Sequence, residues 1–286
     1  MTSKPPAENG PPVGDWNLLW QEALRKKRWD RSDKAHWNRR AASFAQHSRK
    51  NGYAREFLHL MQPQPDWSVL DVGCGAGTLA LPLSPLVRRI TAIDFSENMI
   101  ALLREACSDR GLDNIHTEVV GWEDDWDQAG IGKHDVAIAS RSLVVHDLRA
   151  ALLKLADKAN FRVYISSLVG DGPFDRRLFE AAGRELDRGP DYIYVYNLLY
   201  QMGIHAEVRF VHGDPTDKPY RDVEDALERF QWMFNELTDE ERAGLRAYLK
   251  HHLIRAKEGW TLSYQHIVRW AVISWEKEPC PPPRPA

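Results

Sequence analysis

The sequence of 286 residues is poor in cysteine and has no long apolar run. Its three cysteines, Cys74, Cys107 and Cys280, are widely spaced and odd in number, which argues against a CxxC metal site and a disulfide framework. No apolar stretch approaches the roughly 18–20 residues of a membrane span, and the polar N-terminus lacks the apolar segment of a signal peptide. These absences predict a cytoplasmic protein without a membrane partner.

An excess of charge of one sign is also missing. The formal net charge is −3, from 38 basic and 41 acidic residues, and the basic run at 25–28 is brief. Because proteins that bind a nucleic-acid backbone usually carry a basic surface, nucleic acid is disfavoured as a partner. The histidines form no H-x-x-x-H or H-E-x-x-H pattern, so we expect no metal site.

The chain has the length of a single α/β domain with accessory helices. The proline-rich ends, 1–15 and 279–286, are expected to be disordered because proline at that density blocks helix and sheet. The domain between them, 16–278, divides by its periodicity into three parts. These are helices over 16–61, a core over 66–170, and elements over 171–278 with a helical insertion at 221–256.

Short apolar runs typical of buried strands alternate with helical segments in the core. Strands are expected at 68–72, 89–94, 115–120, 135–139 and 161–168, and two later strands flank the insertion. Strand and helix repeated with short connections indicate a parallel sheet covered on both faces. The predicted fold is therefore α/β, with a Rossmann-like, mostly parallel sheet flanked by helices. The N-terminal helices and the insertion are expected to form a lid.

The most informative segment follows the first strand. Residues 69–78 read Val-Leu-Asp-Val-Gly-Cys-Gly-Ala-Gly-Thr, with three glycines at alternate positions. Without Cβ atoms the backbone can turn sharply and approach a ligand closely, and a helix that begins there points its amides at the ligand. The dinucleotide fingerprint G-x-G-x-x-G would need glycine at position 78, which is threonine.

An acid ends the second strand. Asp94 follows Asp71 at close to the roughly 20-residue offset at which a ribose-binding acid is expected, although it could instead cap the next helix. A carboxylate there can accept hydrogen bonds from both ribose hydroxyls. The glycine string and the segment 92–100 together resemble motifs of class I S-adenosylmethionine-dependent methyltransferases, nearest to quinone-biosynthesis and other small-molecule enzymes.

The resemblance covers about residues 35–170 and implies S-adenosyl-L-methionine as cofactor. The residues it implies for cofactor binding lie in four loops that follow strands: Asp71, Gly73, Cys74, Gly75, Gly77, Asp94, Phe95, Met99, Trp122, Glu123, Asp124, Ser140 and Arg141. Trp122 with Glu123 or Asp124 would hold adenine, unless that loop is only a solvated acidic turn. Ser140 would meet the methionine part. Arg141 would pair with a carboxylate of cofactor or substrate, or form a surface ion pair.

The sequence gives weaker signals for the residues that bind or activate the methyl acceptor. His146 is the candidate general base because it follows the fourth strand, although a structural role is an alternative. Tyr192, Tyr194 and Tyr196 are candidates for the substrate site because aromatic faces stabilise cations, with core packing as the alternative. From the lid, Phe44 and Tyr53 would reach the donor.

The sequence thus predicts a methyltransferase that transfers a methyl group in line to a small-molecule acceptor. Three other functions stay open. A nicotinamide-dependent oxidoreductase is weakened by Thr78 and by the lack of a Tyr-x-x-x-Lys pair. A non-catalytic protein that binds S-adenosylmethionine and an RNA methyltransferase are the other two. Neither the acceptor nor the oligomeric state can be read from the sequence.

Overall fold

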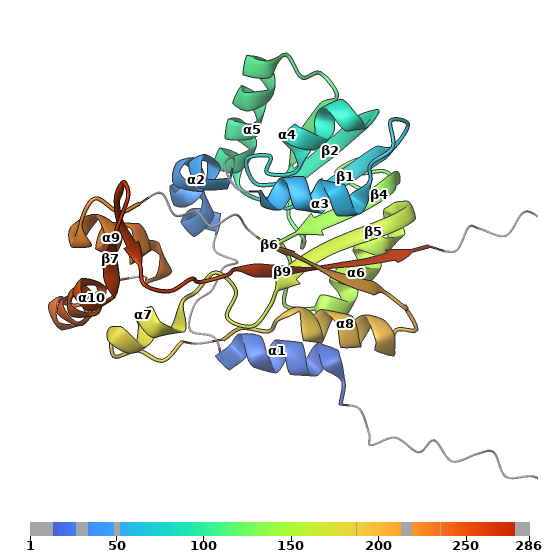
Figure 1. The fold of residues 1–286 in the computed structure, drawn as a ribbon. Helices are drawn as coiled ribbons and strands as arrows, with labels where there is room; N and C mark the ends of the chain where they lie inside the picture. Colours follow the sequence, from blue (N-terminus) through green and yellow to red (C-terminus); the bar gives the residue numbers. More distant parts are fainter. Residues whose placement is uncertain are drawn as a thin grey trace, which may run out of the picture.

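A computed structural model describes residues 14–26, 34–48, 52–186, 188–212, 219–234 and 236–277, without the side chains of residues 44 and 46–48. In these residues seven strands form one sheet in the order β3-β2-β1-β4-β5-β9-β6 (Figure 1). The strands are β1 (Ser68–Val72), β2 (Arg89–Asp94), β3 (Ile115–Val119), β4 (His134–Ser140), β5 (Ala159–Leu168), β6 (Glu207–His212) and β9 (Arg269–Glu276). Only β9 runs antiparallel to its neighbours, β5 and β6. The predicted mostly parallel α/β fold is confirmed.

Helices cover both faces of the sheet, and each face has its own apolar core. The helices are α1 (Trp16–Lys26), α2 (Lys34–Ser48), α3 (Tyr53–Met61), α4 (Ala80–Leu83), α5 (Glu97–Arg110), α6 (Leu148–Asp157), α7 (Arg176–Ala181), α8 (Tyr192–Gln201), α9 (Val223–Phe230) and α10 (Asp239–His252), with short 3-10 helices η1 (Ser84–Leu86) and η2 (Gln231–Met233). Side chains of α3, α4 and α5 pack on one face, and those of α1, α6 and α8 on the other. Every residue of the central strand β1 is buried, as its continuous apolar run predicts.

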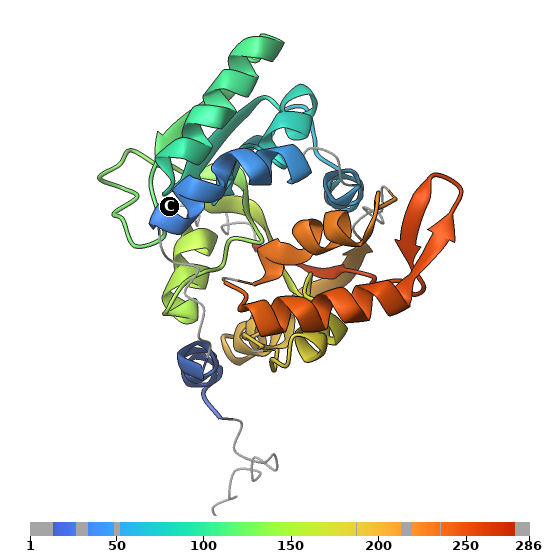
Figure 2. The same cartoon turned by 90° about the vertical axis from the view of Figure 1, so that its left-hand side faces the viewer.

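A third core belongs to the segment between β6 and β9, together with α7. We call α7, α9, η2, α10 and the hairpin of β7 (Leu253–Ala256) and β8 (Gly259–Leu262) the helical unit. It lies beyond the edge of the sheet at which β5 ends and β9 begins (Figures 1 and 2). Helices occupy most of the insertion predicted at 221–256, and Thr238 and Glu241 form a capping box at the start of α10. The helical prediction is wrong for its last four residues, which form β7. The hairpin was not predicted, because its two strands have only four residues each.

Two helical predictions need correction. The helix expected to follow the glycine loop is a single turn, α4, continued by η1, because Pro82 and Pro85 limit its length. The N-terminal helices do not act together as one lid, since α1 contacts α8 and α6 while α2 contacts α5. Except for residues 14 and 15, the ends expected to be disordered lie outside the described residues. Within the described residues, no helix is both long and apolar enough to span a membrane.

Candidate functional site

The glycine loop crosses the carboxyl ends of β1 and β2. Gly73, Gly75 and Gly77 all have left-handed backbone angles, with φ of 67°, 55° and 86°. The amide of Gly73 donates to the carbonyl of Ile93 at 2.8 Å, which holds the loop against β2. A Cβ atom on Gly73 would lie 2.3 Å from the Cβ of Ser142, so a side chain does not fit there. The three glycines therefore allow a tight, closely packed turn where two parallel strands end, which is where ligands bind in open α/β sheets.

Two buried carboxylates flank this loop. Asp94 accepts the amide of Gly75 at 2.9 Å and that of Ser96 at 2.8 Å. Asp71 accepts the amide of Ala80, while its Oδ2 atom is buried without a hydrogen-bond partner. Burial and the neighbouring Asp94 raise the pKa of Asp71 to about 7, and burial raises the pKa of Asp94. Neither carboxylate forms an ion pair among the described residues, and Arg141 lowers the pKa of Asp71 only in part, so the site suits a ligand that brings positive charge and hydrogen-bond donors.

Helix α2 closes one side of the loop. Ala41 and Ala45 of α2 pack against Ala76 of the glycine loop and Met99 of α5. The Asn38 side chain contacts Ser96 Oγ at 2.6 Å, and its backbone carbonyl accepts Asn98 Nδ2 at 3.0 Å. Met99 is thus buried beneath α2. The side chain of Phe44, predicted to reach the donor from this helix, lies outside the described residues.

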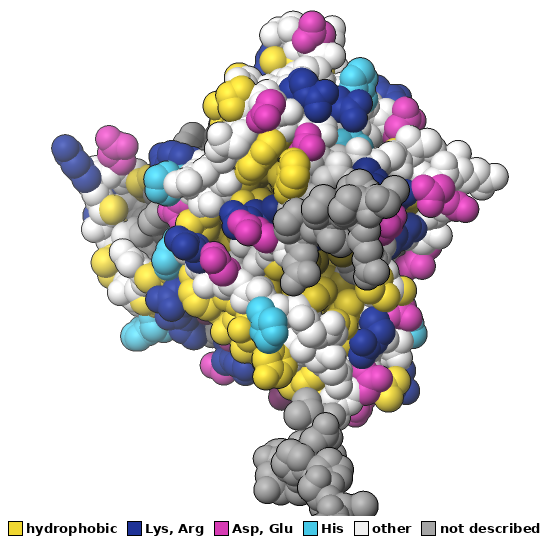
Figure 3. All heavy atoms as spheres, turned by 90° about the vertical axis from the view of Figure 1, so that its right-hand side faces the viewer, with side chains coloured by type: hydrophobic (Ala, Val, Ile, Leu, Met, Phe, Trp, Pro, Cys, Tyr) yellow, Lys and Arg dark blue, Asp and Glu magenta, His cyan; other side chains and the backbone are white. Residues whose placement is uncertain are grey.

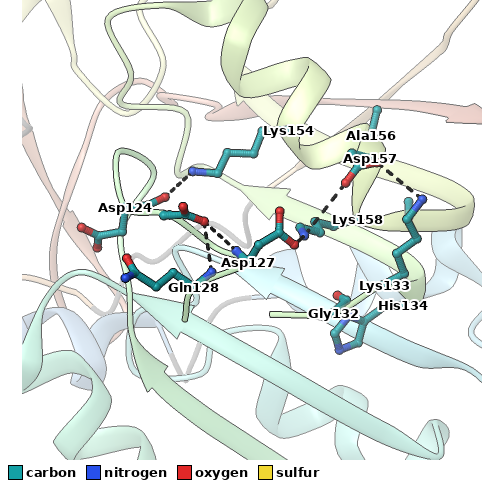
Figure 4. A network of polar contacts seen from close by, with 12 residues as sticks. Asp124, Asp127, Gln128, Gly132, Lys133, His134, Lys154, Ala156, Asp157 and Lys158 are labelled. Atoms are coloured by element: carbon teal, nitrogen blue, oxygen red, sulfur yellow. Dashed lines mark hydrogen bonds and ion pairs between the residues drawn. The ribbon is translucent and has the colours of Figure 1, made fainter. Parts of the chain in front are cut away.

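The loop after β3 is fastened to α6 and its C-terminal end (Figure 4). Lys154 of α6 donates to the backbone carbonyls of Trp122 and Asp124, and Lys158 pairs with Asp127. Trp122 is half-buried against Trp126 and donates its indole N–H to the carbonyl of Ser142 at 2.8 Å.

The acids of this loop are exposed and differ in their contacts. Asp124 accepts the amide of Gly121 at 2.7 Å, whereas the Glu123 side chain has no hydrogen bond to any residue that the structure describes. Phe95 reaches the same place from β2, since a Cβ atom on Gly121 would lie 3.1 Å from the Cβ of Phe95. The structure thus brings Phe95 close to the loop that carries Trp122, and the adenine pocket stays a prediction.

The end of β4 holds a cation between aromatic rings. Arg141 adopts a left-handed backbone with φ of 57°, and its guanidinium carbon lies 4.3 Å from the ring centre of Tyr53 and 5.3 Å from that of Trp270. The Tyr53 hydroxyl is hydrogen-bonded to Ser140 Oγ at 2.7 Å and to Ser166 Oγ at 2.6 Å. Ser140 is therefore fixed by α3 and β5, and Arg141 forms no ion pair with any other residue that the structure describes.

The predicted acceptor residues are more scattered. His146 is exposed in the loop between β4 and α6, so a role as general base stays a prediction. Tyr192 packs on Phe210 of β6 at 5.5 Å between ring centres, and Tyr194 packs on Trp16 of α1 at 5.6 Å. Packing between elements accounts for these two contacts. A substrate role for Tyr192, Tyr194 and Tyr196 stays a prediction.

Residues that sequence reasoning missed come from distant segments. Trp270 begins β9 and lies next to Leu168 at the end of β5, which brings its ring to Arg141. Ser166 lies two residues before the end of β5. His266, just before β9, has a buried Nε2 atom without a hydrogen-bond partner. No local pattern marks these residues, because only the pairing of β5 with β9 places them at this edge.

Comparison with known proteins agrees with this geometry. The family described as Methyltransferase domain matches residues 69–160, which span β1 to the start of β5. An uncharacterised protein of Haemophilus influenzae is 33% identical over 241 residues, covering 84% of this chain and 88% of that protein. The chain belongs to the class I methyltransferases.

One further sequence and one solved structure are similar to this methyltransferase. Nocamycin O-methyltransferase of Saccharothrix syringae is 32% identical over 107 residues, which cover 36% of this chain and 38% of that enzyme. The structure of a candidate methyltransferase of Bacillus halodurans has the same fold, with a TM-score of 0.53 at 12% identity, over 78% of this chain and 98% of that chain.

Proposed function

We propose that this methyltransferase binds S-adenosylmethionine across the glycine loop and transfers its methyl group to a small-molecule acceptor. The bound cofactor supplies a sulfonium methyl group, which transfers in line to a nucleophile. The observation that carries the proposal is the buried Oδ2 of Asp71, which has no partner and lies near a second carboxylate, Asp94. A ligand with an ammonium group and ribose hydroxyls provides the charge and the donors that these two acids lack.

Each part of the loop then has a defined task. The left-handed turns at Gly73, Gly75 and Gly77 carry the loop around the ligand, and the unused lone pairs of Asp94 accept the ribose hydroxyls. Phe95 and Trp122 contact the adenine ring. Of the two exposed acids, Glu123 is the freer to accept the exocyclic amine, because Asp124 already accepts a backbone amide. Cys74 contributes its backbone rather than its thiol, whose pKa burial raises.

The same charges disfavour a dinucleotide cofactor. A pyrophosphate at the glycine loop would face the two carboxylates of Asp71 and Asp94, neither of which forms an ion pair among the described residues. RNA as acceptor gains no support from the face shown in Figure 3, where basic and acidic side chains are interspersed. A protein that only binds the cofactor has the same loop, and only turnover distinguishes it from an enzyme.

We further propose that α2 and the helical unit together form the lid. Arg40 of α2 lies over the ring of Trp232 in η2 at 5.9 Å, so the two elements meet beyond the carboxyl edge of the sheet. The acceptor would then react in a space that the lid screens from water.

Calorimetric titration of the purified chain tests cofactor binding. S-adenosylmethionine and its product S-adenosylhomocysteine (SAH) should bind and raise the melting temperature, whereas NAD should do neither. Asp94→Ala should weaken SAH about 10–100-fold, the effect of losing a charge-assisted hydrogen bond of roughly 1–3 kcal/mol. Asp109→Ala, at an exposed acid of α5, is the matched control. Absence of SAH binding to folded protein would refute the proposal, and absence of methyl transfer to any small-molecule fraction of a cell extract would favour the non-catalytic alternative.

A further inference from the structure

Arg141 is a cation that the protein holds in place but does not neutralise. Its guanidinium stacks on Tyr53 and Trp270, and among the described residues it has no ion pair and no side-chain hydrogen bond. Burial lowers the pKa of the group, although arginine remains charged at any physiological pH. Ring faces attract a cation more weakly than a carboxylate does, and they leave its N–H donors free.

The backbone at this position is constrained as well. Arg141 is one of two described non-glycine residues with a left-handed φ, which is costly for a residue with a Cβ atom. Its amide donates to the carbonyl of Ser166 at 3.1 Å, which ties the turn to β5. Strained residues that the surroundings hold in place cluster at ligand sites.

The contacts of Arg141 give the direction of its side chain. The residues proposed to bind adenosine lie at the ends of β1, β2 and β3, on one side of β4 in the strand order. Tyr53 and Trp270 are fixed to β5 and β9, on the other side. The guanidinium therefore stacks on rings from the β5 and β9 side, while the Asp71 carboxylate of β1 acts on it from the other side.

We infer that Arg141 binds a carboxylate of the methyl acceptor, so that the substrate is a small carboxylic acid. The inference rests on the proposed function and adds the class of acceptor. The planar guanidinium presents paired N–H donors that match the two oxygens of a carboxylate. One cation balances one negative charge, and the nearby carboxylate of Asp71 argues against a doubly charged phosphate. The flanking rings provide an apolar wall for the body of the acid.

The cofactor also has a carboxylate, and one experiment separates the two sources. We would measure the affinities of SAH and of 5′-methylthioadenosine, which lacks the amino-acid part, for wild type, Arg141→Gln and Arg141→Lys. If Arg141 binds the acceptor, the ratio of the two affinities should change less than threefold in either variant. A loss of tenfold or more for SAH alone would mean that Arg141 binds the carboxylate of the cofactor, and would overturn the inference.

A second arm measures acid binding by ligand-observed NMR, with and without saturating SAH. The probes are aliphatic, aromatic and amino-acid carboxylates, each paired with its neutral amide. Acids that bind wild type should bind Arg141→Gln at least tenfold more weakly, and Arg141→Lys to an intermediate degree because lysine keeps the charge without the planar fork. The amides should not distinguish the variants. If no acid prefers wild type over Arg141→Gln by threefold, the inference is wrong.

Arg162→Gln is the matched control for this arm. Arg162 also lies over a tyrosine ring, that of Tyr164, but it pairs with Glu276 and lies in the first half of β5, away from the glycine loop. Its replacement should leave acid binding unchanged. Circular dichroism and melting temperature confirm that each variant is folded. Failure of SAH to bind wild type would refute the proposed function. The NMR measurement without SAH would still show whether Arg141 binds carboxylic acids.

Discussion

Asp71 is a buried carboxylate of the sheet with one oxygen that has no hydrogen-bond partner. It lies in the central strand β1, fully surrounded by protein, and only one of its oxygens has a partner. A buried carboxylate of this kind destabilises the fold when it is charged, because the nearby Arg141 does not offset its lost hydration and the repulsion from Asp94. Such a residue is expected where a ligand supplies the missing partner.

The pH dependence of cofactor binding tests this view of Asp71. Burial and Asp94 raise the pKa of Asp71 to about 7, so the carboxylate is largely protonated at pH 6 and charged at pH 8. SAH, which brings an ammonium group, should therefore bind more weakly as the pH falls from 8 to 6. Calorimetry in buffers of different ionisation enthalpy should show proton release on binding near pH 7.

Asp71→Asn provides the control for that prediction. The variant keeps the shape of the side chain and cannot ionise, so its SAH affinity should be low and nearly independent of pH between 6 and 8. Because the pKa of Asp71 is raised by folding, its charged form lowers the stability of the free protein as the pH rises from about 4 to 7. The variant should consequently unfold at a higher temperature than wild type at pH 8. A wild-type affinity that does not change with pH would show that Asp71 does not bind the ligand.

At the scale of elements, the core strands could be predicted from sequence because both faces of each are covered. The run at 68–72 is apolar enough to indicate burial on both sides, and the observed β1 has the same bounds. The helix after the glycine loop was overestimated, since leucines at helical spacing concealed the effect of two prolines. The split roles of the N-terminal helices depend on tertiary contacts that local periodicity does not report.

Helix α2 is the element whose packing should respond to the cofactor. It contacts the glycine loop through Ala41 and Ala45, and Asn38 joins it to the start of α5. Binding of SAH beneath it should add contacts, so the backbone amides of α2 should exchange with solvent at least tenfold more slowly in the complex. Hydrogen exchange read by mass spectrometry measures this directly.

Helix α1 serves as the internal reference for that experiment. It packs on α8 and α6, and Trp20 donates its indole N–H to the carbonyl of Val145 at 2.8 Å, away from the glycine loop. Its exchange should be the same with and without SAH. Asn38→Ala should reduce the protection of α2 while that of the glycine loop remains. If SAH protects the loop but not α2 in wild type, α2 is not part of the lid.

At the scale of the whole molecule, the cofactor half of the candidate site was predictable and the acceptor half was not. Glycine spacing and the acid at the end of β2 are local signals, and the structure places both at one sheet edge. The ring pair around Arg141 joins α3 to β9, segments more than 200 residues apart in the sequence. The sequence offers Tyr192 and Tyr194 as candidates for the substrate site, yet their rings pack α8 against β6 and α1.

The separate core of the helical unit predicts that it can loosen without loss of cofactor binding. Leu245 of α10 is buried in that core, where α10 approaches α7 so closely at Gly244 that no side chain fits. Leu245→Ala should cost about 2–5 kcal/mol within the helical unit and speed hydrogen exchange there. SAH affinity should change less than threefold, because none of the residues proposed to bind the cofactor belongs to this core.

Leu103→Ala, the same truncation in α5, is the matched comparison. Leu103 is equally buried, and its side chain lies where a Cβ atom of Gly77 would be, so it supports the glycine loop from below. Its truncation should weaken SAH binding at least tenfold at a temperature where the protein remains folded. If the helical unit covers the acceptor, the affinity for carboxylic acids at Arg141 should fall more in Leu245→Ala than in Leu103→Ala. Equal losses of SAH affinity in the two variants would contradict this prediction. They would mean that the helical unit and the sheet form one cooperative structure. The lid could then not open while the cofactor stays bound.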